Sequence, residues 1–278
     1  MTRLLFAALL ALAPVSAPAQ ERVLSIGGAA SEIVAALGAA DRLVGRDTTT
    51  TYPPALTALP DVGYMRALSP EGLLSLNPDL IVLSAGAGPP ETLQALETAG
   101  IAVVQVPEGH DGATVARKVT VIAQALGRPE AGAALAAKLE AEIAAATAAA
   151  QSAGPKPRVL FILSGAGGRL TGAGADTSAD AMIALAGGEN ALAGVSGFKA
   201  LGDEAIAAAA PDVLLVMARH GDAPSEGAAY LAHPALAATP AGRAGRLVEM
   251  EGMFLLGFGP RTAEAITALH GALYPDEG

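Results

Sequence analysis

Residues 129–152 read PEAGAALAAKLEAEIAAATAAAQS, a run composed largely of alanine. Alanine is the best helix former and no glycine follows Gly132, so the run is predicted to be one long helix of about six turns. Pro129 at its start and the sequence GPKP at 154–157 past its end set its limits. We interpret it as a rigid connector between two α/β halves; a helix inside one larger domain is the alternative.

The half that precedes this helix alternates apolar runs with amphipathic segments. Val23–Ile26 is an apolar run that ends in a glycine pair, and an amphipathic segment opens at Ser31 and continues to Leu37. Strand, tight turn and helix in this order are typical of an α/β layer. The continuous apolar run Leu80–Leu83 fits a strand buried on both faces. Further strands are expected at 43–45 and 102–106, and helices at 89–99 and 112–126.

The half that follows the helix repeats this pattern. Strands are expected at 158–163, 213–217 and 247–250, a glycine-rich loop at 164–176, and helices at 178–185 and 262–273. The predicted fold is therefore α/β, with two Rossmann-like lobes, each built on a central and mainly parallel sheet. The expected divisions are a signal peptide at 1–19, an N-terminal lobe at 20–128, a linking helix at 129–153 and a C-terminal lobe at 154–278.

The two halves also share one matching unit. Glu71 is followed at a fixed spacing by Pro78-Asp79 and an apolar strand, and Glu204 is followed at the same spacing by Pro211-Asp212 and another apolar strand. One repeat per half indicates two similar lobes rather than a solenoid, which needs several tandem units. An acidic residue in the first turn of a helix is stabilised by the helix dipole. The alternative is that the two glutamates form matching acidic points that dock onto a partner.

The N-terminus has the features of a secretory signal peptide. Met1-Thr2-Arg3 is positively charged, residues 4–12 are apolar, and Ala17-Pro18-Ala19 is a small-residue cleavage site. The chain has no cysteine, so neither disulfides nor thiolate chemistry are available to it. Its formal net charge of -10 makes nucleic acid and anionic membrane surfaces unfavourable partners. We expect an exported protein without stable membrane insertion.

The sequence DVGYMRALSPEG at 61–72 brings a phenol and a guanidinium close together on a loop. Tyr64 and Arg66 follow a glycine, and Ser69-Pro70 is suited to begin a helix. A tyrosine phenolate is a hard anionic oxygen and a known axial ligand of haem iron, and a neighbouring arginine favours the ionised phenol. The alternative is an interfacial tyrosine whose hydroxyl finds a backbone partner, beside a solvated arginine.

Taken together, these features resemble the substrate-binding proteins of ABC importers whose lobes are joined by a single helix. Within that class, three segments are similar to the periplasmic haem-binding components of bacterial haem importers: DTTTTYP at 47–53, DVGYMRALSPEG at 61–72 and LGFGPRT at 256–262. The resemblance covers essentially the whole mature chain, and the segment around Tyr64 is its most specific part. It implies a periplasmic protein that captures ferric haem b in a cleft between its lobes.

The resemblance also implies roles for individual residues. Tyr64 matches the tyrosinate ligand of the haem iron, Arg66 supports that phenolate, and Arg219 is a second basic residue of the cleft. Glu71 and Glu204 match the pair that engages the permease, so the expected partners are an ABC permease and its ATPase subunits. Met253 and Phe254 are expected to cover the porphyrin. We expect a monomer that performs no chemistry on its ligand.

The sequence differs from that of some haem-binding relatives at one position. Some relatives carry a histidine after the serine of the loop that follows the first strand of the second lobe, whereas Ser164 is here followed by Gly165. A second axial ligand from that position is therefore not predicted. No two of His110, His220, His233 and His270 have the spacing of a helical zinc site, and His220 is the candidate for an additional iron ligand.

Two other functions remain open from the sequence. The same fold binds ferric siderophores or cobalamin, in which case basic and aromatic side chains would make the contacts without a tyrosinate ligand. An exported α/β enzyme is the other class, but the sequence contains no G-x-S-x-G elbow, catalytic cysteine or H-E-x-x-H motif. Tyr52, which precedes Pro53, is the nearest rival to Tyr64 as a ligand.

Overall fold

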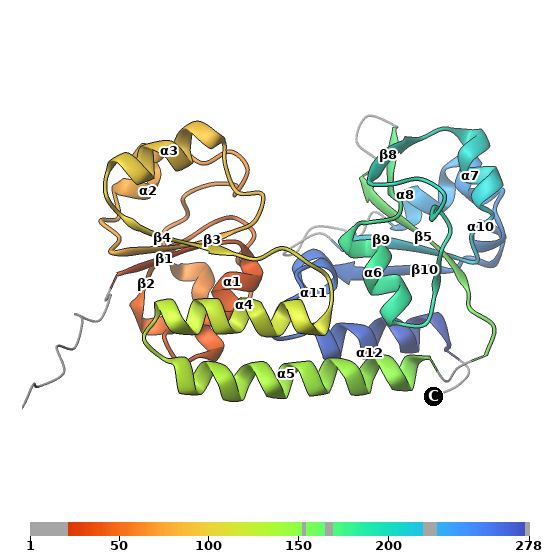
Figure 1. Cartoon of the computed structure of the whole chain (residues 1–278). Coiled ribbons are helices and arrows are strands. Elements are labelled where there is room, and N and C mark those ends of the chain that lie inside the picture. Colours follow the sequence, from red (N-terminus) through yellow and green to blue (C-terminus); the bar gives the residue numbers. More distant parts are fainter. Residues whose placement is uncertain (1–21, 152–153, 165–168, 219–226, 276–278) are drawn as a thin grey trace, which may run out of the picture.

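The computed structural model describes residues 22–151, 154–164, 169–218 and 227–275. The predicted signal peptide lies outside these residues. The described chain forms two lobes that stand side by side above one long helix, α5 (Pro129–Ala150) (Figure 1).

The first lobe contains a four-stranded parallel sheet in the order β2-β1-β3-β4. Its strands are β1 (Val23–Ile26), β2 (Leu43–Arg46), β3 (Leu80–Ser84) and β4 (Ala102–Val106). Helices α1 (Gly28–Ala36) and α4 (Gly112–Ala125) cover one face, and α2 (Pro70–Leu74) and α3 (Pro90–Thr98) cover the other (Figure 1). The strand predicted to be buried on both faces, β3, is confirmed, because its first four residues are all buried.

The second lobe contains a mixed sheet in the order β10-β9-β5-β6-β8, with the short β7 also paired to β5. The strands are β5 (Arg158–Ser164), β6 (Leu170–Ala173), β7 (Glu189–Asn190), β8 (Phe198–Leu201), β9 (Val213–Ala218) and β10 (Leu247–Glu251). Strands β10, β9 and β5 run parallel, whereas β6 pairs antiparallel with both β5 and β8. The sheet is mainly parallel as predicted, and its antiparallel part arises because a piece of the expected glycine-rich loop forms β6.

The helices of the second lobe include several short ones. They are α6 (Ser178–Leu185), α7 (Asp203–Ala209), α8 (Gly227–Ala232), α9 (Pro234–Ala237), α10 (Pro240–Ala244), α11 (Gly252–Leu256) and α12 (Thr262–Leu273). The 3-10 helices η1 (Ala40–Arg42) and η2 (Pro54–Ala58) lie in the first lobe. In the part of the chain described above, no helix is both long and apolar enough to cross a membrane.

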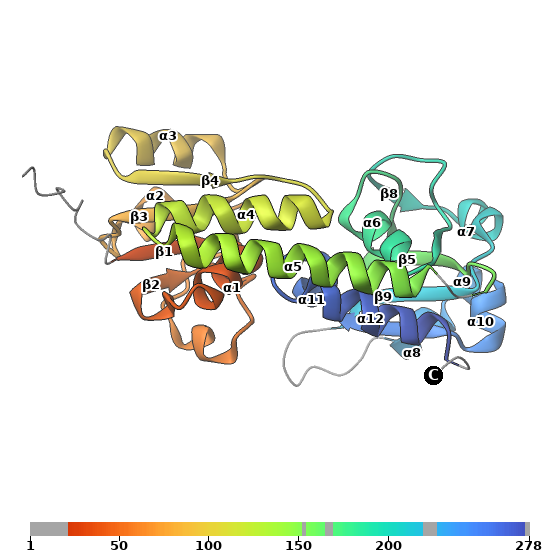
Figure 2. The same ribbon diagram turned by 60° about the horizontal axis from the view of Figure 1, so that its bottom comes forward.

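The predicted long helix is α5, which spans Pro129–Ala150. It runs beneath both lobes, with α4 beside it under the first lobe and α12 beside it under the second (Figure 2). Its buried residues include Leu139 and Ile143, which belong to a core that also contains Val23 of β1 and Leu273 of α12. The helix is therefore packed into one hydrophobic core that extends through both lobes.

The repeated Pro-Asp unit has the same geometry in both lobes. The backbone N–H of Arg22 donates to the Asp79 carboxylate at 3.1 Å, and that of Arg158 donates to the Asp212 carboxylate at 2.9 Å. Each arginine side chain also donates to backbone carbonyls just after or at the end of the helix that precedes the Pro-Asp pair. The sequence repeat is thus a structural repeat, and it puts Glu71 of α2 and Glu204 of α7 at equivalent positions.

Both units turn through a left-handed residue directly before proline. Asn77 has φ 44° and Ala210 has φ 40°. Asparagine tolerates this conformation better than other residues with a side chain, whereas alanine has no polar group to support it.

Candidate functional site

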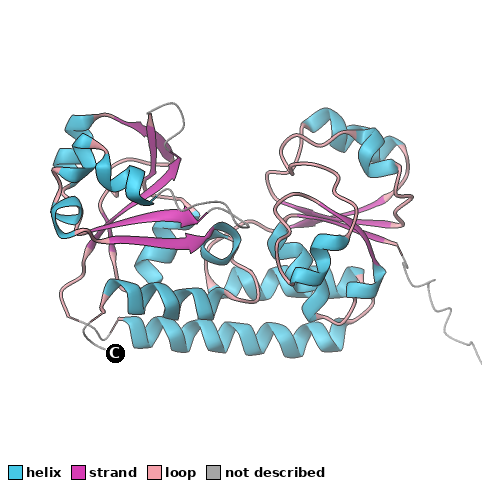
Figure 3. Cartoon of the chain, turned by 180° about the vertical axis from the view of Figure 1, so that it is seen from behind, coloured by secondary structure: helices cyan, strands magenta, loops and turns pink. Residues whose placement is uncertain are grey.

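The parallel strands of the two sheets point toward one another, so their carboxyl ends face the middle of the molecule (Figure 3). Ligands of open α/β sheets bind at the carboxyl ends of the strands. The loops that follow β1, β2 and β10 therefore lie where a ligand would bind. Segments that follow β5 and β9, including the predicted Arg219 and His220, lie outside the described residues.

The loop that carries Tyr64 is held by backbone hydrogen bonds on both sides. Gly63 donates its N–H to the Asp61 carboxylate at 2.8 Å, and its carbonyl accepts from the N–H of Thr48 at 3.0 Å. Gly63 has φ 95°, a conformation that favours glycine. The N–H of Ala67 donates to the carbonyl of Tyr64, which closes a turn over Met65 and Arg66. Tyr64 therefore lies at the start of a tight turn that a glycine introduces.

Tyr64 and Arg66 are brought together as predicted. The Arg66 guanidinium donates to the Tyr64 phenol oxygen at 3.0 Å, and the tyrosine side chain is 44% exposed. Because Arg66 donates, the phenol oxygen retains a lone pair for a further partner. The pair therefore presents an exposed phenol oxygen with a guanidinium beside it.

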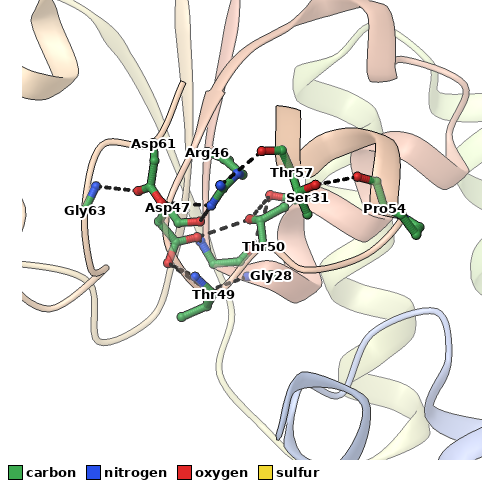
Figure 4. A network of polar contacts seen from close by, with 11 residues as sticks. Gly28, Ser31, Arg46, Asp47, Thr49, Thr50, Pro54, Thr57, Asp61 and Gly63 are labelled. Carbon is green, nitrogen blue, oxygen red and sulfur yellow. Dashed lines mark hydrogen bonds and ion pairs between the residues drawn. The ribbon is translucent and has the colours of Figure 1, made fainter. Parts of the chain in front are cut away.

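A buried carboxylate organises the base of this region. Asp47 is fully buried and accepts from the backbone N–H of Gly27 at 2.9 Å and of Thr49 at 3.1 Å. It also accepts from the hydroxyls of Thr49 and Thr50 (Figure 4). Buried charges are tolerated when hydrogen bonds satisfy them, and these bonds join the end of β1 to the loop after β2. The threonine-rich segment is thus fixed by these bonds, and its residue Thr48 in turn hydrogen-bonds to Gly63 of the Tyr64 loop.

A second interaction joins the same loop to β2. Arg46 at the end of β2 forms an ion pair with Asp61 at 3.0 Å and also donates to the carbonyl of Thr57 (Figure 4). Because Asp61 also accepts from Gly63, the ion pair links the strand end to the residue that precedes Tyr64.

The second lobe contributes the segment that follows β10. Glu251 caps α11 by accepting from the backbone N–H groups of Met253 and Phe254. A β-carbon at Gly28 would lie 3.0 Å from the Met253 methyl group, so this methionine packs against the first lobe. Met253 and Phe254, both predicted to cover a ligand, are partly buried at the junction of the lobes.

Arg261 connects these elements across the two lobes. It donates to the Glu32 carboxylate through two nitrogens, one of them at 2.9 Å, and its guanidinium carbon lies 4.1 Å from the centre of the Tyr52 ring. The same carbon lies 5.1 Å from the centre of the Phe254 ring. Burial raises the pKa of Glu32, although Arg261 opposes the rise.

A neighbouring contact between the lobes involves Lys118 of α4. Its ammonium group is buried and donates to the carbonyl of Phe258 at 3.1 Å. Burial is the main cause that lowers the pKa of Lys118 to about 8. Phe258 itself has φ 48°, and its buried ring contacts His110 edge-on with the ring centres 5.1 Å apart.

The two glutamates of the structural repeat lie at the starts of two short helices. Glu71 and Glu204 are exposed in the first turns of α2 and α7. These two helices lie on the side of the molecule opposite α5 (Figure 1).

Sequence reasoning did not identify Glu32, Lys118 or Arg261 as members of this region. Glu32 and Lys118 lie on amphipathic helices, where a charge is normally solvent-exposed. The single available signal was the glycine-rich LGFGPRT segment that contains Arg261. His270, interpreted as structural or solvated, is hydrogen-bonded to the carbonyl of Ala186.

A family model for periplasmic binding proteins matches residues 23–252. The chain belongs to this family. The solved periplasmic heme-binding protein BhuT, in complex with two hemes, is 48% identical; the match covers 91% of this chain and 98% of that one, with a TM-score of 0.85. The periplasmic heme-binding protein RhuT from Roseiflexus sp. RS-1, in apo form, is 43% identical with a TM-score of 0.88, and the match covers 92% and 98% of the two chains.

More distant relatives include another heme-binding protein and a vitamin B12-binding protein. A periplasmic heme binding protein from Pseudomonas aeruginosa is 37% identical, with a TM-score of 0.84 and coverage of 92% and 94%. The vitamin B12-binding protein of Yersinia pestis is 28% identical over 66% of this chain and 65% of its own length. These similarities agree with the predicted two-lobed fold.

Proposed function

We propose that this protein is a periplasmic substrate-binding protein that captures ferric haem between its lobes and delivers it to an ABC importer. The observation that carries the proposal is the hydrogen bond from Arg66 to the exposed Tyr64 phenol oxygen. It acts as a binding protein and not as an enzyme. The similarity to periplasmic heme-binding proteins, at up to 48% identity among the structures described above, supports the same ligand.

Tyr64 is the proposed ligand of the haem iron. Ferric iron is a hard cation that prefers anionic oxygen, and tyrosinate is an established axial ligand of haem. Arg66 stabilises the phenolate, and Arg219 supplies a further positive charge for the haem carboxylates. Met253 and Phe254 supply apolar contacts to the porphyrin from the opposite lobe.

Delivery requires a second surface, which we assign to Glu71 and Glu204. Both are exposed at equivalent positions of the two lobes, in α2 and α7, and these helices lie on the side opposite α5 (Figure 1). The proposed partners are the permease and, through it, the ATPase subunits. The protein acts as a monomer, and its signal peptide at 1–19 is removed on export to the periplasm. The proposed divisions are 20–128 for the first lobe, 129–153 for the linking helix and 154–278 for the second lobe.

Binding of cobalamin is the alternative function, and the relatives described as vitamin B12-binding proteins favour it. A ferric siderophore is the other ligand of this fold. Neither ligand needs a tyrosine oxygen on its metal, so the Tyr64–Arg66 pair would be without a role.

The absorption spectrum of Tyr64→Phe mixed with hemin tests the proposal. This substitution removes the oxygen and keeps the ring, so the apo protein should retain its stability. The tyrosinate charge-transfer bands of the wild-type complex should disappear. Tyr52→Phe is the matched control, since Tyr52 is equally exposed at 43%, and its spectrum should be unchanged. A wild-type spectrum from Tyr64→Phe, or loss of the bands in Tyr52→Phe, would contradict the assignment.

A further inference from the structure

Five side chains form a cluster where the lobes meet: Glu32 and Tyr52 from the first lobe, and Glu251, Phe254 and Arg261 from the second. We call this cluster the Arg261 junction. Glu32 lies on α1, Tyr52 lies in the loop after β2, and Arg261 immediately precedes α12. Residues 32 and 261 are 229 positions apart in sequence and belong to different lobes, so their contact depends on the relative position of the lobes.

Arg261 is the centre of the junction. Its guanidinium makes a two-nitrogen pair with Glu32, whose side chain is only 6% exposed, and lies 3.9 Å from the Glu251 carboxylate. Its faces are close to the rings of Tyr52 and Phe254. Arginine is suited to both tasks, because its planar group binds carboxylates with two hydrogen bonds and stacks on aromatic rings. A lysine could satisfy only part of this geometry.

A buried ion pair depends strongly on its geometry. Desolvation of both charges is offset only when the hydrogen bonds are well formed, so the pair tolerates few relative placements of the groups that carry it. Because Glu32 and Arg261 belong to different lobes, this restriction applies to the separation of the lobes.

The junction is also connected to the loop that carries Tyr64. Thr51, next to Tyr52, donates to Glu251 at 3.4 Å, and Thr48 in the same loop donates to the carbonyl of Gly63. Tyr64 follows Gly63 directly. The Arg261 junction and the segment that carries the proposed iron ligand are therefore connected through one short loop.

We propose that Arg261 is a positioning residue of the ligand site, which fixes the separation of the lobes through Glu32 and Tyr52 and so slows haem release. The part that concerns haem rests on the function proposed above. The part that concerns the lobes does not, since the junction is formed by this chain alone.

Lobe separation is measurable in the apo protein by spin-label distances. The chain has no cysteine, so the exposed positions in Glu97→Cys of α3 and Ala207→Cys of α7 give one label in each lobe. The test variants are Glu32→Gln, which keeps the shape of the side chain, and Arg261→Lys, which keeps the charge. Glu189→Gln is the matched control, because its ion pair with Arg158 lies within the second lobe.

Both test variants should broaden the distance distribution and release haem about tenfold faster, equivalent to about 1.4 kcal/mol. The charge-transfer bands should remain, because Tyr64 is intact. The control should match the wild type in both measurements. Wild-type distances in both folded variants, or wild-type release despite altered distances, would overturn the proposal. If wild-type protein bound no haem, the proposed function would fail, while the apo distances would still decide the role of Arg261 in lobe placement.

Discussion

Substitution of Arg66 tests its support of Tyr64 separately from the bond that Tyr64 is proposed to make to the haem iron. In Arg66→Ala the phenol oxygen of Tyr64 remains, but the positive charge 3.0 Å away is lost. The Tyr64 oxygen then loses its cationic hydrogen-bond donor, so haem affinity should fall by about tenfold. Hemin titrations measure this, with Arg66→Lys as the control that retains a charge; a wild-type affinity in Arg66→Ala would argue against this role.

Lys118 should give the apo protein an unusual stability profile at alkaline pH. Burial lowers its pKa to about 8 from 10.5 in the unfolded chain, so the unfolded state binds more protons between these values. The free energy of unfolding should therefore rise as the pH increases from 8 to 10.5, by up to about 3 kcal/mol. Below pH 8 the lysine is charged in both states, and the cost of burying it is fully present.

Substitution of Lys118 should remove this alkaline rise in the free energy of unfolding. Lys118→Met should abolish the rise in urea unfolding experiments across the same pH range. Lys138→Met is the control, because Lys138 is 66% exposed on α5, and the rise should persist in that variant. An alkaline profile of Lys118→Met that matches the wild type would show that another group is responsible.

Residue-level prediction succeeded where neighbours in sequence form the contact. Tyr64 and Arg66 are two positions apart, so the glycine and the turn were enough to predict that they meet. Glu32 and Arg261 meet only after both lobes have formed, and no local pattern in the sequence contains that information. The charge of Glu32 lies among apolar residues of a helix-forming segment, where a solvent-exposed position is the usual expectation, and Arg261 lies in a glycine-rich segment that predicts a loop.

The turn after α7 contains one strained residue, Ala210, whose strain a glycine would remove. Ala210 adopts φ 40°, and a left-handed conformation costs a residue with a β-carbon about 1–2 kcal/mol. Glycine has no such cost, so Ala210→Gly should raise the free energy of unfolding by about 1 kcal/mol. Ala207→Gly, three residues earlier inside α7, should instead lower it by about 0.5–1 kcal/mol. Urea denaturation measures both changes, and equal effects of the two glycines would refute the interpretation.

Element prediction worked best where composition is extreme. The alanine-rich α5 and the fully apolar β3 were found at nearly their observed limits. Helix α1 begins at Gly28 and not at Ser31, since glycine there allows close packing against Thr49 and Met253. Strand β6 was missed because glycine and alanine are weak strand formers, and its pairing with β5 and β8 comes from tertiary structure.

For the whole molecule, the two exposed glutamates should serve delivery and not ligand binding. Glu71→Lys together with Glu204→Lys reverses the charge at equivalent points of both lobes. Haem affinity should stay within about twofold of the wild type, because neither residue is a proposed contact of haem, and a twofold change is only about 0.4 kcal/mol. Stimulation of the ATPase of the cognate importer in proteoliposomes should be lost, since reversed charges would oppose docking onto the permease.

The control for this experiment is reversal of two exposed acidic residues that are not part of the structural repeat. Glu91→Lys with Glu142→Lys changes the net charge by the same amount, and stimulation should be retained. If the test variant lost haem binding to the same degree as transport, the assignment to docking would be wrong.

The hydrophobic core joins β1, near the start of the described chain, to α12, near its end. Packing of a core drawn from such distant parts of the sequence requires the closure of very large loops, which slows folding. The two lobes therefore share one core, although each has its own sheet. A chain still lacking α12 would leave the apolar side of α5 uncovered beneath the second lobe. A chain in which α12 has not yet packed would therefore expose this apolar surface to proteases and to proteins that hold unfolded chains.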